Sequence, residues 1–137
     1  MIDKAKICEL LQSNFSEITA IYLFGSHATG TTGADSDLDL AVLLPHSLSE
    51  SVGNLRCGRI QSDLEGALSM TVDLVNIRLA STVLQKEIIR AEHVLFYSNE
   101  VERIQFKMEV LSDYQRLNEE RAEIIESFKE DGIAVAQ

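Results

Sequence analysis

Apolar residues along this chain of 137 residues recur first at helical spacing, then in short runs, and the two patterns alternate to the C-terminus. Apolar positions three or four residues apart indicate helices, whereas short apolar runs bounded by glycine, proline or polar residues indicate strands. The alternation predicts an α/β fold with one small sheet. We expect helices over residues 3–15, 50–68 and 81–90, and strands over residues 18–24, 37–44, 70–75 and 94–97.

The helix expected over residues 50–68 follows Pro45, which ends the preceding strand. Ser47 or Ser49 can cap this helix, and Glu50 stands three residues after Ser47, as in a capping box. Arg56 and Arg59 would lie within this helix, on a solvated face; the alternative is that they reach a phosphate.

The last helix is expected to be long, because no glycine or proline occurs from about residue 99 to residue 131. At 1.5 Å per residue it would measure about 50 Å, whereas a domain of this size is about 35 to 40 Å across. Its far end would then project beyond the domain; the alternative is a break near Asn118 and a packed helical hairpin. One apolar stripe is expected along it, formed by Ile104, Met108, Leu111, Tyr114, Leu117, Ile124 and Phe128.

The candidate chemistry lies between the first two strands, where a glycine-bearing loop begins at Gly25 and ends at the pair Asp37 and Asp39. Positions i and i+2 of a strand point to one face, so these two carboxylates are expected side by side. Carboxylates so close repel each other unless a cation lies between them. Mg²⁺ binds carboxylate oxygens together with substrate phosphates. The pattern therefore predicts a triphosphate-binding loop facing a metal-binding acidic pair.

Two other phosphate- or metal-binding motifs are excluded by single residues. A P-loop needs lysine after its last glycine, but Thr31 follows Gly30. An EF-hand loop starting at Asp35 would need glycine at its sixth position, which is Leu40. The remaining alternative is that the aspartates are ordinary turn or surface residues. It does not explain why Asp39 and Asp73 interrupt otherwise apolar strands.

Composition narrows the function further. The net charge is −10, which argues against a long nucleic-acid footprint and favours a partner with a basic surface. No apolar stretch reaches the length of a membrane span, and the first residues lack a signal-peptide core. Cys8 and Cys57 fit no zinc spacing. We therefore expect a cytoplasmic protein with no direct contact to nucleic acid or membrane.

The segment from Phe24 to Val42 resembles a known signature. Gly25-Ser26, ten residues and then Asp37-x-Asp39 is similar to the motif of the polymerase-β-like nucleotidyltransferase superfamily. The segment resembles most the minimal nucleotidyltransferases, the MntA-type antitoxins that are paired with HEPN-domain toxins. This resemblance implies a small mixed sheet flanked by helices, within a single domain over residues 1–137 whose residues 99–131 form a C-terminal helical extension.

The resemblance also implies the roles of the site residues. Gly25 and Ser26 would bind the phosphates of ATP, and Asp37 and Asp39 would bind two Mg²⁺ ions, with Asp73 as the third carboxylate. His27 stands where the family often has arginine, so it would offer one hydrogen bond to a phosphate in place of a guanidinium fork. The implied reaction is transfer of AMP from ATP to a hydroxyl, expected to be that of a tyrosine, on a cognate HEPN toxin.

Two other functions stay open at this point. A small-molecule nucleotidyltransferase of the aminoglycoside-resistance type would suit an acidic surface, but such enzymes usually carry a further helical domain for the acceptor. A non-catalytic antitoxin that acts by binding alone would not need to keep mutually repelling carboxylates.

Overall fold

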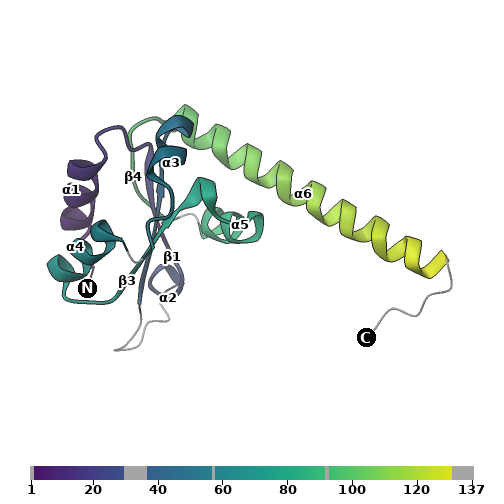
Figure 1. Cartoon of the computed structure of the whole chain (residues 1–137), viewed down its shortest axis with the longest axis horizontal. Helices are drawn as coiled ribbons and strands as arrows, with labels where there is room; N and C mark the ends of the chain where they lie inside the picture. Colours follow the sequence, from purple (N-terminus) through teal and green to yellow (C-terminus); the bar gives the residue numbers. More distant parts are fainter. Residues whose placement is uncertain (1, 30–36, 57, 92, 131–137) are drawn as a thin grey trace.

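The computed structural model describes residues 2–29, 37–56, 58–91 and 93–130 (Figure 1). Helices and strands alternate, as the hydrophobic pattern predicts. The strands are β1 (Ala20–Phe24), β2 (Leu38–Leu43), β3 (Val72–Asn76) and β4 (Val94–Tyr97). The helices are α1 (Lys4–Asn14), α2 (Ser26–Thr29), α3 (His46–Val52), α4 (Arg59–Leu68), α5 (Thr82–Arg90) and α6 (Glu100–Glu130), with a 3₁₀ turn, η1 (Ile77–Leu79), after β3.

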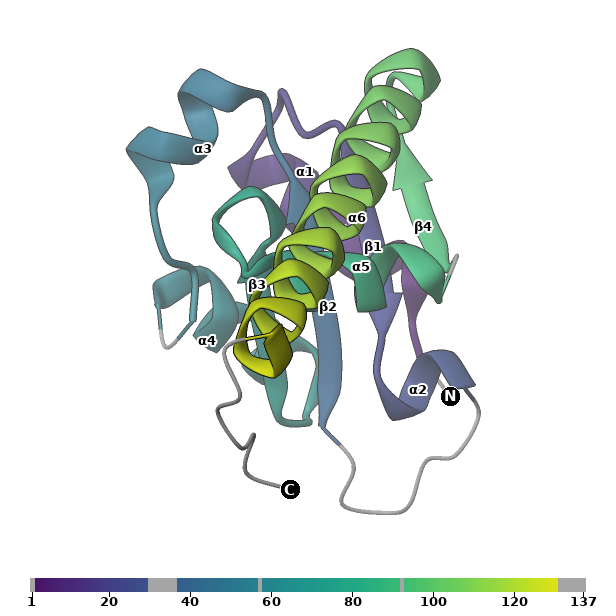
Figure 2. The same cartoon turned by 90° about the vertical axis from the view of Figure 1, so that its right-hand side faces the viewer.

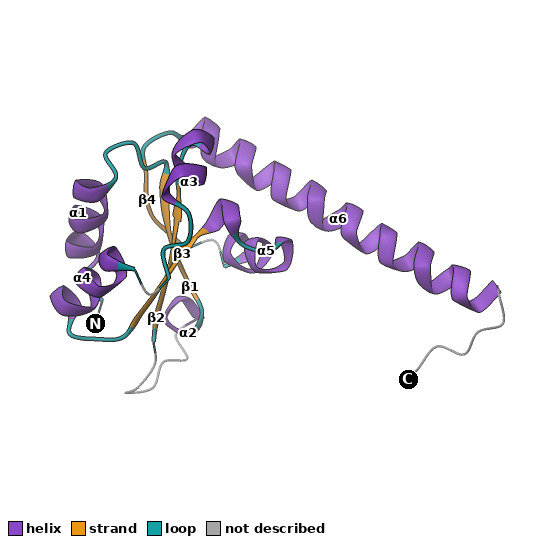
Figure 3. Ribbon diagram, viewed as in Figure 1, coloured by secondary structure: helices purple, strands orange, loops and turns teal. Residues whose placement is uncertain are grey.

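The four strands form one mixed sheet in the order β3-β2-β1-β4. Strand β1 is antiparallel to both β2 and β4, whereas β2 and β3 are parallel. Figure 3 shows the strands enclosed between helices. The expected small mixed sheet flanked by helices is confirmed.

The helices divide between the two faces of the sheet. Helices α1 and α4 lie on one side, and α5 and α6 lie on the other (Figures 1 and 2). In β2, Leu38 and Leu40 belong to the core under α1 and α4, whereas Ala41 and Leu43 belong to the core under α5 and α6. Both faces of the central strands are therefore buried, which accounts for their apolar sequences.

The outer edge of β3 is covered by side chains of α4. Glu65 accepts a hydrogen bond from the backbone N–H of Val72, and Gln61 accepts one from the backbone N–H of Leu74, each at 3.0 Å. These bonds satisfy backbone groups that an edge strand leaves unpaired. Helix α4 thus fixes the position of the strand that carries Asp73.

The single helix expected over residues 50–68 is wrong, because the structure has two helices there, α3 and α4. Helix α3 ends at Gly53, which has a φ of 70° that favours glycine. The expected capping box is wrong as well: α3 begins at His46, with Pro45 at its N-cap, and no side chain caps it. The break is fixed by the buried Asn76 of β3, which donates hydrogen bonds to the carbonyls of Ser49 and Gly53 at 3.2 and 3.0 Å.

Helix α6 runs without a break through 31 residues, about 46 Å, as expected, and the alternative of a break near Asn118 is wrong. Its first turns pack on the domain through the buried Phe106 and Val110. Its C-terminal half projects away from the sheet (Figure 1), as the longer of the two alternatives predicts. Along the described residues, no helix is both long and apolar enough to cross a membrane.

The single apolar stripe expected on α6 is wrong in its first half. Ile104, Met108 and Leu111 are exposed, and Phe106 and Val110 face the core instead. At about 100° per residue, the exposed set lies roughly opposite the buried pair. Ile124 and Phe128, in contrast, continue the line of the buried pair, beyond the part of the helix that the domain covers.

Candidate active site

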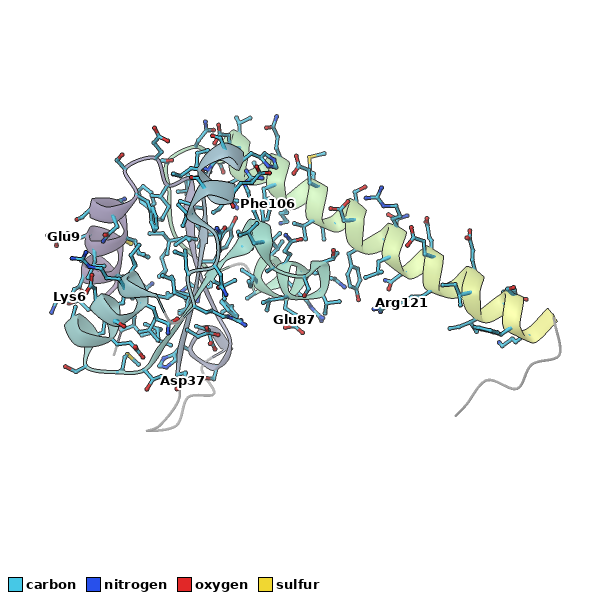
Figure 4. All side chains as sticks on the ribbon, viewed as in Figure 1. Lys6, Glu9, Asp37, Glu87, Phe106 and Arg121 are labelled. Carbon is cyan, nitrogen blue, oxygen red and sulfur yellow. The ribbon has the colours of Figure 1, made fainter. Side chains whose placement is uncertain are left out.

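Asp39 and Asp73 are paired directly across the parallel strands β2 and β3. The neighbours of each aspartate in its strand, such as Leu38 and Val72, face the core under α1 and α4. Side chains alternate along a strand, so both aspartates point to the other face, the side of α5 and α6. Asp37 precedes β2 by one residue and is exposed, and Figure 4 shows it at the lower end of the sheet.

Electrostatic interactions show that these acids form one group. The pKa of Asp39 is raised above its ordinary value, first by burial and then by the negative charges of Asp73 and Asp37. The positive charges of His27 and Arg56 act in the opposite direction. The folded protein therefore holds an incompletely neutralised cluster of negative charge around Asp39.

Gly25 lies directly against the carboxylate of Asp39. Strand β1 pairs Phe24 with Asp39, so the turn that begins at Gly25 starts beside this side chain. The φ of Gly25 is 71°, and a Cβ on this residue would collide with the Oδ2 atom of Asp39 and lie 3.0 Å from its Cγ. Only glycine satisfies both requirements, which explains the residue at this position.

Ser26 and His27 form the start of α2, immediately after Gly25, and both are partly buried. Gly30, Gly33 and Asp35, which belong to the same predicted loop, lie outside the described residues. The structure thus brings Gly25, Ser26 and His27 to the end of the sheet that carries the three aspartates.

Arg56 also belongs to this group, and its expected position within a helix is wrong. It lies in the connection between α3 and α4, and its Nε is 3.1 Å from the Oδ1 of Asp73. Its side chain is 48% exposed, whereas that of Arg59 is 93% exposed. The signal that could have found it is Gly53, since a helix ending there frees the next residues to turn towards β3.

A cavity of about 430 Å³ lies beside this ion pair. Its walls come from the α3–α4 connection, the end of β3, η1 and the start of α5: Asn54, Arg56, Val75, Asn76, Leu79, Ala80, Ser81 and Leu84. A second cavity, of about 300 Å³, lies between Tyr22 of β1 and Arg103 of α6 and contains none of the predicted site residues.

The donor set suits a hard divalent cation, because Asp37, Asp39 and Asp73 supply carboxylate oxygens whose mutual repulsion a cation would relieve. Among the described residues, no three acidic, histidine or cysteine side chains are already arranged around a metal position. Asp73 is instead engaged by Arg56. A metal bound through Oδ1 of Asp73 would therefore compete with the guanidinium of Arg56.

Comparisons with known proteins agree with this geometry. Residues 5–101 match the family model described as "Polymerase beta, Nucleotidyltransferase". The chain is 34% identical to the protein adenylyltransferase MntA of Shewanella oneidensis over 125 residues, which cover 91% of this chain and 86% of that protein.

Solved structures of toxin–antitoxin complexes are also similar to this chain. A toxin–antitoxin crystal structure with AMP-PNP matches at a TM-score of 0.75 and 32% identity, covering 93% of this chain and 99% of that one. A chain from the complex of a tri-AMPylated Shewanella oneidensis HEPN toxin with its MNT antitoxin matches at a TM-score of 0.67 and 30% identity, covering 92% of this chain and 95% of that one.

Proposed function

The chain belongs to the polymerase beta nucleotidyltransferase family, and we propose that it is an antitoxin that transfers AMP from ATP to a hydroxyl of a HEPN-domain toxin. The observation that carries this proposal is the direct pairing of Asp39 with Asp73, with Gly25 against the carboxylate of Asp39. This arrangement combines a phosphate-approaching turn with an acidic group that needs cations. The resulting modification, or the binding that accompanies it, would neutralise the toxin.

Two Mg²⁺ ions held by Asp37 and Asp39, with Asp73 as the third ligand, would supply charge neutralisation for the phosphates of ATP. The residues of the chain would bind and orient the triphosphate. The turn at Gly25 lets its backbone approach the triphosphate, where Ser26 can donate its hydroxyl hydrogen bond. His27 can donate one more hydrogen bond to a phosphate oxygen.

The proposed reaction is an in-line displacement at the α-phosphorus of ATP. A hydroxyl oxygen of the toxin, which we expect to be that of a tyrosine, forms the new bond to this phosphorus. The bond between the phosphorus and the pyrophosphate oxygen breaks, and pyrophosphate leaves. The carboxylate of Asp73 is suited to accept the proton of the hydroxyl.

The choice of partner and nucleotide is supported by the relatives. The Shewanella oneidensis relative is a protein adenylyltransferase, and one similar chain was solved with AMP-PNP. Another was solved in complex with a tri-AMPylated HEPN toxin, which supports repeated addition of AMP to one toxin molecule. We propose the same donor and partner class for this chain, acting in the cytoplasm.

The test is AMP transfer by a variant that lacks the acidic pair. With ATP, Mg²⁺ and the cognate HEPN protein, the wild type should add AMP, detected as a mass increase of the partner. Asp37→Asn with Asp39→Asn should abolish the addition without loss of the fold, because removing like charges relieves repulsion. Asp63→Asn, on the exposed face of α4, is the matched control and should retain activity. Full activity in the double variant would refute the roles given to Asp37 and Asp39, and a wild type that adds no AMP would refute the proposed function.

A further inference from the structure

Arg56 stands between the carboxylate cluster and the 430 Å³ cavity, and it belongs to both. Its Nε contacts the Oδ1 of Asp73, and its side chain also lines the cavity. Val75, which lines the same cavity, lies two residues after Asp73 and on the same face of β3. The cavity therefore opens about 6.6 Å along the strand from the proposed proton acceptor.

The position of Arg56 is built into the fold. The buried amide of Asn76 holds the carbonyls of Ser49 and Gly53, and its oxygen accepts a hydrogen bond from the hydroxyl of Ser49 at 3.0 Å. The side chain of Asn54 then accepts a hydrogen bond from the backbone N–H of Arg56 at 3.0 Å. The connection is thus fixed to β3 at its start, whereas the guanidinium at its end is half exposed.

The order of the strands assigns this cavity to the acceptor side of the site. The turn at Gly25 follows β1, on one side of the central strand β2, and Asp73 lies on β3, on the other side. In an in-line displacement the attacking and leaving oxygens lie on opposite sides of the phosphorus. With the triphosphate held on the β1 side, the acceptor approaches from the β3 side, where the cavity lies.

The walls of the cavity suit a nucleotide better than an unmodified tyrosine. Val75, Leu79 and Leu84 provide apolar surface for a base, while Asn54 offers a side-chain amide at the rim. Arg56 provides a planar cation, which matches a phosphate oxygen pair. A tyrosine hydroxyl brings no negative charge to this guanidinium, whereas an AMP group already attached brings one phosphodiester.

We propose that Arg56 and this cavity form a subsite for the AMP already attached to the acceptor, so that Arg56 governs the second and later additions. The inference rests on the proposed function and deepens it. In these additions the attacking group is a ribose hydroxyl of the attached AMP. Its oxygen bonds to the α-phosphorus of a new ATP, its proton passes to Asp73, and pyrophosphate leaves. Arg56 meanwhile exchanges Asp73 for the phosphodiester, which frees the carboxylate.

The test compares the rates of successive additions in the Arg56→Ala variant. Intact-mass spectra of the HEPN partner over time, with ATP and Mg²⁺, resolve the species that carry one, two and three AMP groups. We expect the ratio of second-addition to first-addition rate to fall by about tenfold or more, the effect of losing one charge-assisted hydrogen bond. The partner with one AMP should therefore accumulate. Arg56→Lys should restore part of the ratio, since lysine keeps the charge but not the fork.

Arg59→Ala is the matched control, because it removes the same charge from the same region but from a fully exposed side chain. It should leave the ratio at the wild-type value. A binding measurement gives a second readout: Arg56→Ala should weaken the binding of purified mono-AMPylated partner more than that of the unmodified partner.

Four results would overturn the inference. An equal fall of both rates in Arg56→Ala would show that Arg56 acts only through Asp73, and two unchanged rates would show no role. A wild-type protein that adds a single AMP would remove the need for the subsite while leaving the proposed function intact. A wild-type protein that adds none would refute both.

Discussion

At the scale of single residues, the site is organised around Asp39. This carboxylate is partly buried, is paired with Asp73, and has the backbone of Gly25 against it. Burial and the two neighbouring acids raise its pKa. Without a cation, the repulsion between these carboxylates destabilises the folded state. We interpret this destabilisation as a consequence of a site that is built to bind a cation.

The raised pKa of Asp39 predicts a pH-dependent gain in stability for Asp39→Asn. The folded state binds the proton of Asp39 more tightly than the unfolded state, so this group destabilises the fold once pH exceeds its ordinary pKa. The variant should therefore have a higher Tm than the wild type at pH 7, and the difference should vanish as pH falls below that ordinary pKa. Thermal unfolding monitored by circular dichroism from pH 3 to 7 checks this.

Adding Mg²⁺ to the same thermal unfolding experiment tests whether Asp39 takes part in metal binding. At pH 7, added Mg²⁺ should raise the Tm of the wild type more than that of Asp39→Asn, because a ligand that binds only the folded state stabilises it. A lower Tm for the variant at pH 7 would contradict the charge-repulsion argument.

At the scale of elements, the break between α3 and α4 brings Arg56 to the site. Asn76 maintains the break through three hydrogen bonds in a buried environment, to the carbonyls of Ser49 and Gly53 and from the hydroxyl of Ser49. Asn76, Ser49 and Gly53 thus form a buried polar hub, and such a network stabilises the fold only while all its members are paired. The hydrogen bonds of Asn76 therefore stabilise α3 and also fix the position of Arg56 on the acceptor side of the site.

Asn76→Ala should destabilise the protein by about 3 kcal/mol, because it leaves two carbonyls and one hydroxyl without their partner. Chemical denaturation checks the value. Asn54→Ala removes the same amide from an exposed position in the adjoining connection and should cost less than about 1 kcal/mol. Equal costs for the two variants would show that the buried hub does not hold the break.

At the scale of the whole molecule, α6 extends the surface beyond the domain. Arg78 lies 5.1 Å from the ring centroid of Phe106, and Lys86 lies 3.7 Å from that of Tyr114, so the first half of the helix is fastened to η1 and α5. Ile124 and Phe128 are 56% and 43% exposed and lie on the same line as the packed residues. We propose that these two side chains pack on the HEPN partner.

Ile124→Ala with Phe128→Ala should weaken binding to the HEPN partner by more than tenfold, since burying each side chain at an interface contributes about 1.5 to 3 kcal/mol. The Tm of the free protein should hardly change. Calorimetric titration checks the binding affinity, and thermal unfolding checks the Tm. Phe106→Ala, on the buried part of the same face, should instead cost about 3 to 5 kcal/mol of stability. A double variant that unfolds several degrees earlier and still binds would show that α6 folds back on its own domain.

The mixed strand directions of the sheet were implied by the family resemblance, whereas local patterns in the sequence were enough for the order of the strands and for a loop that joins Gly25 to the acidic pair. Each depends on residues near one another in the chain: apolar periodicity, an i, i+2 spacing on one strand, and a glycine at a turn. The length of α6 also followed from sequence, because a stretch without glycine or proline leaves nothing local to end it.

The tertiary structure decided the features that depend on residues far apart. Asn76 reaches back from β3 to end α3 at Gly53, which no periodicity in residues 50–68 could reveal. Phe106 and Ile104 are both apolar, so the sequence alone does not show which face of α6 packs on the domain. The contacts with the sheet and with Arg78 decide that Phe106 is the buried one. The place of Arg56 beside Asp73 followed from the break. Burial and ion pairing are set by partners distant in sequence, so the acceptor side of the site emerged only when the chain was folded.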